Sequence, residues 1–519
     1  MGELSTMLRV GDVWEGLTGS VEGCPPQLIE RVFSATVIDS RSVTPGALFV
    51  ALKGERTDGH LYLQDAFNRG ALAAIVEAKG IRDSSLPIAE YLVVNCADGR
   101  IESPGSEAHD VRLLFVAEES LAGLQRLAGY WRARMPAVTI GITGSVGKTT
   151  TKEIVANVLA QRFVTLRSEG NLNNEIGLPL TLLRLESRHQ RVVLEMGMYA
   201  PGEITRLCEL ARPRIGVVTT VGPAHLERLG TIERITQAKT ELVQALPAAA
   251  DGGTAILNAD DPRVRSMAGL TRARVFTYGL NPASDLWADK ITSEGLEGIR
   301  FRLHHGHDSF HLHLPLLGRH SVHTALRGAA VGLVEGMSWT EIIAGLRQVH
   351  GQLRLLVVPG LRDTTLIDDT YNASPESMLA ALNLLEDLTA QAGKKRREGQ
   401  RSVAVLGDMY ELGTFEEEGH RLVGGRAARV LDLNPVGFVH GKLVTVGSRA
   451  RWIAEEALSS GMPAADVHIT ETNTDAIAVL QGLIQPGDVI LVKGSRAAAM
   501  ESIVDALSRS RRSGVNNSW

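Results

Sequence analysis

Cysteine is scarce in this sequence. The 519 residues include 3 cysteines, Cys24, Cys96 and Cys208. They lie far apart in the chain and no pair has the spacing of metal ligands, so we expect neither a disulfide framework nor a zinc site. A chain that needs no disulfides suits a reducing compartment, which predicts a cytoplasmic protein.

An excess of charge of one sign and long apolar runs are also lacking. Lys and Arg total 54 against 59 for Asp and Glu, a formal net charge of -5, which argues against nucleic acid as a partner. No apolar run approaches the ~18 residues that span a bilayer. The first residues do not have the basic-then-apolar order of a signal peptide. We therefore expect no membrane insertion.

Aromatic residues are few as well, at 4%, whereas glycines number 53 and hydrophobic residues make up 44% of the chain. A chain of this length allows two to four domains of about 100–200 residues each. Many glycine turns between aliphatic strands and helices are typical of α/β folds, in which glycine also lets the backbone approach a phosphate.

The order of the expected elements divides the chain into three stretches. Short strands and one helix up to about residue 78 predict a small α/β domain, followed by an exposed loop at residues 95–110. From the amphipathic helix at residues 120–135, strands and helices alternate, which predicts a largely parallel sheet covered on both faces. The alternation resumes from about Arg354 and predicts a second doubly wound domain.

The segment GITGSVGKTTTKE, residues 141–153, follows an apolar strand and opens a helix. Gly144 and Gly147 let the backbone wrap a phosphate, Lys148 can reach the β and γ oxygens, and Thr149 can hold Mg²⁺. The usual spacing has a glycine where Ile142 stands, and a turn without a ligand is the alternative. The predicted nucleotide-binding residues here are Gly144, Ser145, Val146, Gly147, Lys148, Thr149 and Thr150.

Phosphoryl transfer from ATP needs a divalent metal, whose oxygen ligands should lie at strand ends near this loop. Glu195 ends the apolar strand RVVLEMG and is the best carboxylate candidate; an ordinary strand-end acid is the alternative. His225 lies in a turn beyond another strand, where a histidine taken alone is more often structural than a ligand.

Lys239 lies in the apolar stripe of a predicted helix, because Ile235, Lys239, Leu242 and Leu246 recur at helical spacing. A lone ammonium is costly there. The lysine could carry its head to water, form a salt bridge, or be covalently modified into an anionic ligand. The sequence does not separate these alternatives.

Further polar residues follow other strands. Asn258 is a plausible adenine-binding residue, while the adjacent acids at 260 and 261 could reach ribose or solvent equally well. The segment LIDDTYNASPES, residues 366–377, suits either an interdomain site or a simple turn with a helix cap. A strand-to-helix turn suited to an anionic ligand places together Lys493, Ser495 and Arg496. These patterns predict a cleft enzyme that uses MgATP.

In these motifs the sequence resembles the Mur ligases, and within them the branch that adds D-alanyl-D-alanine. The resemblance rests on IDSRSVTPGALFVALKGERTDGH, GITGSVGKTTTKE, SEGNLNNEIGLPLTLL, LEMGMYAPGEI, VGPAHLERLG with QAKTEL, LNADDP, GRHSVHTAL, LIDDTYNASPESM, LGDMYELG and VKGSRAAAM. It implies an α/β, three-domain architecture: a small UDP-precursor-binding domain at 1–118, a central P-loop ATP-binding domain at 119–352 and a C-terminal Rossmann-like ligase domain at 353–519.

The resemblance also implies roles for single residues. Lys148 would contact the phosphates and Thr149 one of two Mg²⁺ ions, and Lys239 would be carbamylated. Glu195 and His225, with that modified lysine, would complete the metal ligands. Further nucleotide contacts would come from Asn258, His320, Arg354 and Asp369. Substrate contacts would come from Ser40, Arg41, Asn171, Asn173, Asn174, Asn372, Lys493, Ser495 and Arg496.

The implied reaction joins UDP-N-acetylmuramoyl-tripeptide and D-alanyl-D-alanine through an acyl phosphate, in a monomer. Another amide-forming ligase of the superfamily, or a nucleotide-binding relative without catalysis, is the alternative. The sequence departs from the family where relatives often carry Asn, at Ser321, Thr324 and Ser374.

Overall fold

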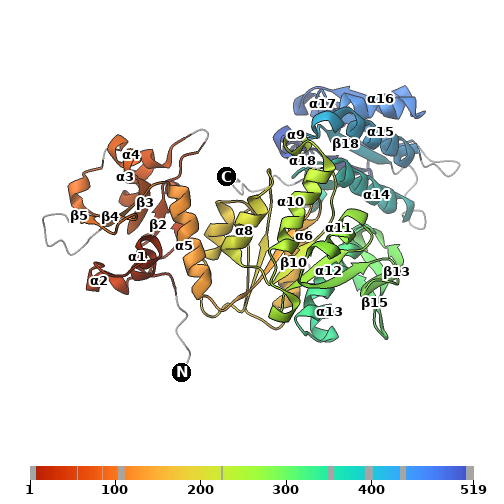
Figure 1. Ribbon diagram of the computed structural model, residues 1–519. Coiled ribbons are helices and arrows are strands. Elements are labelled where there is room, and N and C mark those ends of the chain that lie inside the picture. The colour runs from red at the N-terminus through yellow and green to blue at the C-terminus, as the bar shows by residue number, and fades with distance from the viewer. Residues whose placement is uncertain are drawn as a thin grey trace.

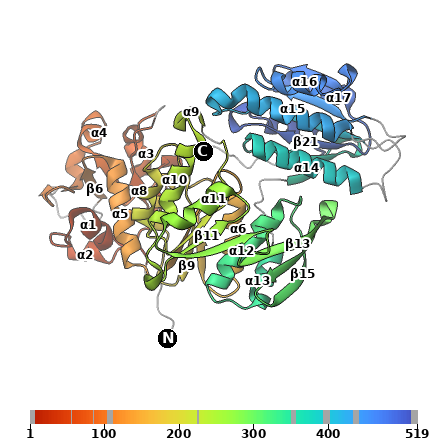
Figure 2. The same cartoon turned by 45° about the vertical axis from the view of Figure 1, so that its right-hand side comes forward.

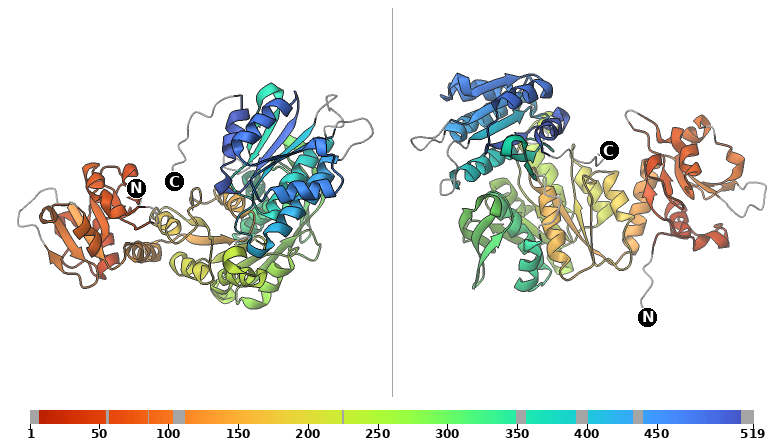
Figure 3. Two further views of the ribbon diagram at one scale, coloured as in Figure 1. Left: turned by 90° about the horizontal axis from the view of Figure 1, so that it is seen from above. Right: turned by 180° about the vertical axis from the view of Figure 1, so that it is seen from behind.

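The computed structural model describes residues 7–54, 57–84, 86–102, 112–223, 226–348, 356–391, 401–432 and 440–509. Two of the predicted site residues, His225 and Arg354, lie outside these ranges. Three sheets succeed one another along the chain, and the domain built on the second sheet lies between the other two (Figures 1 and 3).

The N-terminal domain is built on a six-stranded sheet, parallel except for its last edge strand. Its order is β1 (Thr36–Val37), β2 (Leu48–Val50), β3 (Ala73–Glu77), β6 (Arg112–Ala117), β4 (Tyr91–Asn95) and β5 (Ile101–Glu102). Side chains of β3 alternate between two cores. Its helices are α1 (Val10–Thr18), α2 (Pro26–Ile29), α3 (Leu63–Asn68) and α4 (Ala78–Asp83).

The prediction of an exposed loop at residues 95–110 is wrong in part, because β5 lies inside that range and pairs antiparallel with β4. Both residues of β5 are exposed, so this edge strand is held by backbone pairing and carries no hydrophobic pattern that a sequence would reveal. Residues 103–110 lie outside the described residues.

Helix α5 (Ser120–Arg134) joins the first domain to the second. It packs against α1 and β3 on one side and against two helices of the central domain on the other. Trp131 is fully buried, and its indole N–H donates to the Leu185 carbonyl at 2.9 Å. The amphipathic helix predicted here is thus buried on more than one side.

The central domain contains a nine-stranded sheet. Its order is β15 (Asp308–Leu314), β14 (Ile299–His305), β13 (Leu286–Ser293), β12 (Arg274–Gly279), β11 (Thr254–Asn258), β10 (Ile215–Val218), β7 (Val138–Thr143), β9 (Arg191–Glu195) and β8 (Thr165–Arg167). Strands β7 to β12 are parallel to their neighbours, whereas β14 pairs antiparallel with β13 on one side and with β15 on the other. The alternation of strands and helices in the sequence did not predict this antiparallel part.

Helices cover both faces of the parallel part, as predicted. Val192 and Leu194 of β9 point to one face and Val193 to the other. One face packs against α5, α7 (Gly177–Leu182), α8 (Glu203–Ala211) and α10 (Ile232–Gln244); the other packs against α6 (Lys148–Leu159), α12 (Ser321–Val334) and α13 (Trp339–Arg347). Two short helices, α9 (Leu226–Leu229) and α11 (Pro262–Ser266), follow β10 and β11.

The C-terminal domain is the second doubly wound unit (Figure 2). Its sheet has the order β16 (Leu356–Pro359), β17 (Thr365–Asp369), β21 (Val489–Lys493), β18 (Ser402–Gly407), β19 (Lys442–Val446) and β20 (Val467–Thr470), with β16 antiparallel. Its helices are α14 (Pro375–Gln391), α15 (Glu416–Asp432) and α16 (Arg451–Ser459) on one face, and α17 (Asn473–Leu483) and α18 (Glu501–Leu507) on the other. No helix of the described chain is both long and apolar enough to cross a membrane.

Candidate active site

A cavity of about 960 Å³ lies between the central and C-terminal domains. Its walls come from the segments that follow β7, β9 and β10 in the central sheet and β17, β18 and β21 in the C-terminal sheet. The carboxyl ends of parallel strands are where open α/β sheets bind ligands. Two such edges therefore face a single space.

The loop after β7 adopts the strained backbone that its glycines allow. Gly144 has φ +144°, and a Cβ atom there would lie 1.8 Å from the Thr219 hydroxyl oxygen. Gly147 has φ +83° and precedes the first residue of α6. Both conformations favour glycine, and the loop leads into a helix N-terminus that attracts anions.

A segment after β10 holds this loop in place. The Ser145 N–H donates to the Thr220 carbonyl at 2.8 Å, and the Thr219 hydroxyl donates to the Val146 carbonyl at 2.7 Å. The Ser145 hydroxyl and Gly222 are also hydrogen-bonded, at 3.0 Å. Thr219 and Thr220 were not predicted from the sequence; the only signal was a polar pair directly after an apolar strand.

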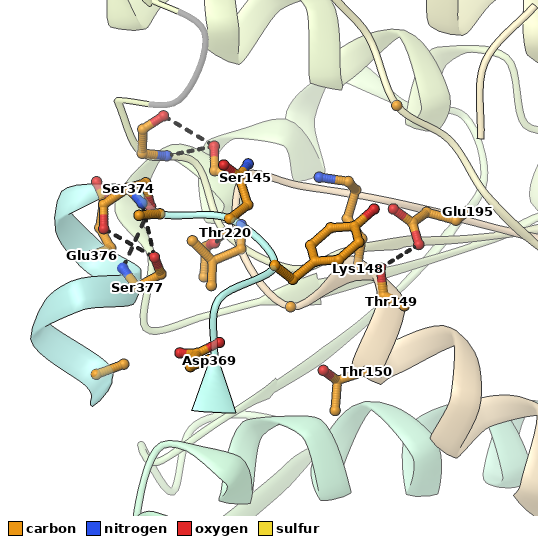
Figure 4. Close-up of a pocket in the computed structure, with 18 of the residues that line it drawn as sticks. Ser145, Lys148, Thr149, Thr150, Glu195, Thr220, Asp369, Ser374, Glu376 and Ser377 are labelled. Carbon is orange, nitrogen blue, oxygen red and sulfur yellow. Dashed lines mark hydrogen bonds between the residues drawn. The ribbon is translucent and has the colours of Figure 1, made fainter. Parts of the chain in front are cut away.

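Glu195 lies beside the loop, at the end of β9 (Figure 4). It is 1% exposed, and each of its carboxylate oxygens has a donor. The Thr149 hydroxyl donates to Oε2 at 2.6 Å, and the Asn173 amide donates to Oε1 at 2.9 Å. Lys148 folds back over the loop and donates to the Gly144 carbonyl at 2.9 Å. The cluster presents oxygen atoms and a cation at one point of the cavity wall.

Lys239 reaches the same wall from α10. Its side chain is 2% exposed, and no hydrogen-bond or ion-pair partner is found for it among the described residues. Burial, and then the nearby charge of Lys148, hold the pKa of Lys239 well below its usual range. The amine therefore does not carry its head to bulk water, and within the described ranges the salt bridge considered from the sequence is absent.

The three asparagines after β8 have different partners. Asn173 holds Glu195, as described above, whereas the Asn174 side-chain oxygen accepts from the N–H of Gly177, the first residue of α7, at 2.9 Å. Asn171 is exposed to the cavity. All three asparagines line the cavity, and Asn171 and Asn174 are the exposed ones.

Asn258 lines the cavity but is 4% exposed. Its amide nitrogen donates to the Thr219 carbonyl at 3.0 Å, and its oxygen accepts from the Asp260 N–H at 3.1 Å. The neighbouring Asp261 accepts from the Val221 N–H at 2.8 Å. These side chains tie β11 to the segment that holds the phosphate loop, and Asn258 keeps one amide hydrogen for a ligand.

The start of α12 forms the wall below the loop. His320 lines the cavity there, and its enclosure by the cavity walls, with the positive charges of His323, Arg327 and Lys493, lowers its pKa to about 4. It is therefore neutral at pH 7. The Ser321 hydroxyl donates to the Leu317 carbonyl at 2.6 Å, so the serine that departs from the family pattern binds its own chain.

The C-terminal domain contributes an ion pair. The Lys493 ammonium, 2% exposed, donates to Asp369 Oδ2 at 2.7 Å and to the Asn372 carbonyl at 3.0 Å. The charge of Lys493 is thus already paired with Asp369, and its side chain fixes the turn after β17. Ser495 accepts from the Tyr410 N–H at 2.9 Å, and Arg496 lies over the Tyr371 ring, 5.3 Å from its centroid.

Helix α14 of the same domain begins against the phosphate-loop scaffold (Figure 4). A Cβ atom at Gly222 would lie 2.4 Å from Glu376 Oε1, and Gly222 is the residue that binds the Ser145 hydroxyl. Burial raises the pKa of Glu376. The C-terminal domain therefore touches the segment that shapes the loop, through a glutamate that was not predicted from the sequence.

Comparison with known families shows what this architecture is. The chain matches the model of the Mur ligase family catalytic domain over residues 33–103, the Mur ligase middle domain over 142–332 and the Mur ligase glutamate ligase domain over 353–496. Together these matches cover more than half of the chain. It belongs to the Mur ligase family.

Individual relatives of this Mur ligase are similar over nearly their whole length. It is 37% identical to the UDP-N-acetylmuramoyl-tripeptide--D-alanyl-D-alanine ligase of Mycobacterium tuberculosis, over 96% of this chain and 97% of that relative. Among solved structures, MurF from Acinetobacter baumannii matches with a TM-score of 0.75 and 28% identity, covering 96% of this chain and 98% of the other. MurF ligase from Thermotoga maritima in complex with ADP matches with a TM-score of 0.69 and 26% identity, covering 91% and 96%.

Most predicted site residues of this Mur ligase lie on the cavity wall, but Gly144, Ser40 and Arg41 do not. Ser40 and Arg41 belong to the N-terminal domain, where Arg41 forms an ion pair with Asp39 at 2.7 Å and Ser40 is buried. The positions of His225 and Arg354 lie outside the described residues. The structure therefore brings together the predicted residues of the second and third domains.

Proposed function

We propose that this Mur ligase joins D-alanyl-D-alanine to UDP-N-acetylmuramoyl-tripeptide with consumption of ATP. The name of the Mycobacterium tuberculosis relative supports the assignment. The observation that carries it is a single cavity in which the phosphate loop, Glu195 and the turn after β17 face one another. A ligase of this kind must hold a nucleotide, a carboxylate and an amine in one enclosed space.

The nucleotide binds along the phosphate loop. The N–H groups at the start of α6 and the Lys148 ammonium bind the phosphates, since both carry positive charge at one place. The base and ribose lie towards Asn258 and His320, and Asp369 and Arg354 are further proposed nucleotide contacts. The ADP complex of the Thermotoga maritima ligase supports an adenine nucleotide.

Each of the three domains, at residues 1–118, 119–352 and 353–519, binds a different part of the substrates. Ser40 and Arg41 of the first bind the UDP-sugar end of the precursor, and the central domain binds ATP. Asn171 and the last domain contact the peptide and the incoming dipeptide, through Asn372, Ser495 and Arg496. The ion pair between Lys493 and Asp369 holds this part in position.

The residues beside the loop fit a divalent metal. The Thr149 hydroxyl and the Glu195 carboxylate contact each other, and both offer oxygen ligands, which Mg²⁺ prefers. No group of three His, Cys, Asp or Glu side chains in the described ranges could hold a metal ion, so the proposed ligand set for two Mg²⁺ ions draws on the Thr149 hydroxyl, His225 and a modified Lys239. Bound Mg²⁺ would offset the charge that develops on the phosphates.

Carbamylation of Lys239 suits its surroundings. The amine is buried and unpaired in the described part of the chain, and its burial lowers its pKa, which favours the neutral form. A neutral amine adds to CO₂ to give a carbamate and one proton. The product carries a carboxylate-like group, which removes the cost of a buried cation and supplies an oxygen ligand.

The reaction runs in two steps. An oxygen of the tripeptide carboxylate attacks the γ-phosphorus of ATP, which forms an acyl phosphate and releases ADP. The amine of D-alanyl-D-alanine then attacks the acyl carbon, phosphate leaves, and the nitrogen loses a proton to give the amide. Lys148 offsets the charge that develops during transfer, and the enclosed cavity protects the acyl phosphate from water.

One chain is sufficient for this chemistry, because the central and C-terminal domains of a single chain line the cavity. We propose a monomer that acts in the cytoplasm, where nucleotide-linked precursors and ATP are both present.

The experiment incubates the protein with MgATP, UDP-N-acetylmuramoyl-tripeptide and D-alanyl-D-alanine, and follows the product by mass spectrometry. We expect a UDP-linked pentapeptide, and ADP in equal amount, only when both substrates are present. Parallel reactions offer D-alanine, lysine or diaminopimelate in place of the dipeptide. Equal turnover with any single amino acid would favour another ligase of the family, and no product in any reaction would favour a non-catalytic relative.

A further inference from the structure

Arg327 is a buried cation next to the phosphate loop, and no sequence motif marked it. It lies in the second turn of α12, is 5% exposed and lines the cavity. Helix α12 packs against α6, which carries the guanidinium under the start of α6. A Cβ atom at Gly147 would lie 3.4 Å from Nη1 and 3.5 Å from Nη2 of Arg327.

The hydrogen bonds of Arg327 fix its orientation without neutralising its charge. Its Nε donates to the His323 carbonyl and its Nη2 to the Thr324 hydroxyl, both at 3.0 Å. The Tyr278 side chain lies beside it, with the guanidinium carbon 6.0 Å from the ring centroid, and its hydroxyl also interacts with the guanidinium. No carboxylate forms an ion pair with Arg327 within the described ranges, and burial lowers its pKa. A buried cation without an anionic partner is costly.

Two other buried arginines show what a structural role looks like in this chain. Arg401 forms an ion pair with Asp488 at 2.8 Å. Arg132 has no carboxylate partner in the described part of the chain, but its donors reach the carbonyls of Met135, Ala137 and Ala211, so the guanidinium is enclosed by acceptors. Arg327 has neither arrangement, and it faces a cavity that the other two do not line.

We propose that Arg327 binds the polyphosphate chain of the nucleotide on the side of the phosphate loop that faces α12. A planar guanidinium offers paired N–H groups that match phosphate oxygens. Thr324, where relatives often carry Asn, acquires a role as the residue that orients this guanidinium. The inference rests on the proposed nucleotide site and adds to it a phosphate contact from outside the glycine loop.

The experiment measures the affinity of the full-length protein for ADP and for inorganic tripolyphosphate by calorimetry. Arg327→Gln is expected to weaken both by roughly 10- to 100-fold, because a charge-assisted phosphate contact is lost. Arg327→Lys keeps the charge but loses the paired N–H groups. Its affinities for both probes are expected to lie between those of the wild type and those of Arg327→Gln. Arg191→Gln is the matched control: Arg191 pairs with Glu335 away from the cavity, and its loss should change neither affinity.

Unchanged binding of both probes by Arg327→Gln would overturn the inference, as would weaker binding of ADP with unchanged binding of tripolyphosphate. If Arg327→Gln does not fold, Arg327→Lys decides, since wild-type affinity for both probes would count against a paired contact. Lys148→Ala distinguishes failure of the proposed nucleotide site from failure of the proposed phosphate contact of Arg327. If Lys148→Ala loses ADP binding and Arg327→Gln keeps it, the proposed nucleotide site is supported and the role of Arg327 is contradicted. If the wild-type protein binds no ADP, the proposed nucleotide site itself is contradicted.

Discussion

Lys239 is a buried residue whose position was predictable from the sequence but whose surroundings were not. Its position in an apolar stripe was predictable from the spacing of Ile235 and Leu242, and the structure places it at the cavity wall without a partner in the described part of the chain. The sequence left three alternatives open because it does not show what lies opposite a helix face. Packing of α10 beside the phosphate loop supplies that information.

Replacement of this lysine tests its proposed modification. Lys239→Ala is expected to lower the ligation rate at least about 100-fold, since an oxygen ligand and its charge are lost, and added acetate or formate should restore part of it. Lys79→Ala, which removes an exposed lysine from α4 of the N-terminal domain, is the control and should stay active. Absence of rescue, together with an unmodified Lys239 in a crystal of the wild-type protein, would contradict carbamylation.

His420 makes stability depend on pH. It is fully buried in α15; its Nε2 accepts from the Met409 N–H at 3.0 Å, so Nδ1 carries the hydrogen and donates to the Glu416 carbonyl at 2.6 Å. The bond from Met409 needs the neutral ring, and burial lowers the pKa of His420 from 6.5. The unfolded chain therefore binds more protons, and the free energy of unfolding should fall as pH drops below 6.5.

Urea denaturation at pH 7.5, 6.5 and 5.5 measures this dependence. His420→Gln is expected to cost about 1–3 kcal/mol at pH 7.5, through the lost buried hydrogen bonds, and to show a smaller decrease on acidification than the wild type. An equal decrease in both proteins would assign the pH dependence to other groups.

At the scale of elements, the phosphate loop is a backbone device. Its shape depends on the positive φ of Gly144 and on the close approach of Thr219. Gly144→Ala is expected to lower ADP affinity and ligation rate by roughly 10-fold or more, because a methyl group would displace the loop. Gly482→Ala is the control, since a Cβ atom there meets nothing within 4 Å and α17 should gain about 0.5–1 kcal/mol.

Calorimetry with ADP and the ligation assay check both glycine variants. Wild-type affinity and rate in Gly144→Ala would show that the loop tolerates a side chain, which the geometry excludes.

Elements with a strong pattern could be predicted, and those fixed by distant contacts could not. The parallel strands of the central sheet, such as Arg191–Glu195, are continuous apolar runs, and the glycine loop follows one of them directly. The antiparallel strands Ile299–His305 and Asp308–Leu314 instead alternate apolar residues with arginine and histidine, a pattern that differs from the continuous apolar runs of the parallel strands. The contact of Arg327 with the loop arises from the packing of α12 on α6, which no local sequence signal records.

At the scale of the whole molecule, the cavity joins segments that are more than 200 residues apart in the chain. Glu376 touches Gly222, and Lys493 holds the turn at Asn372 over the same space. The sequence predicted three domains, and most of the predicted site residues in the described ranges lie on this wall. The nucleotide contacts implied for Asp369 already placed the third domain against the second. The contact between Glu376 and Gly222 was not predicted, because the details of a domain interface depend on surfaces that motifs do not describe.

In the proposed reaction, one cavity holds the nucleotide, the carboxylate and the amine, and the amide forms through an acyl phosphate. The most direct measurement uses UDP-N-acetylmuramoyl-tripeptide whose terminal carboxylate carries ¹⁸O at both oxygens, with MgATP and D-alanyl-D-alanine, and analyses the released phosphate by mass spectrometry. We expect one ¹⁸O atom in the phosphate for each amide formed, because the bridging oxygen of the acyl phosphate comes from the carboxylate. Amide formation with unlabelled phosphate would contradict the proposed reaction.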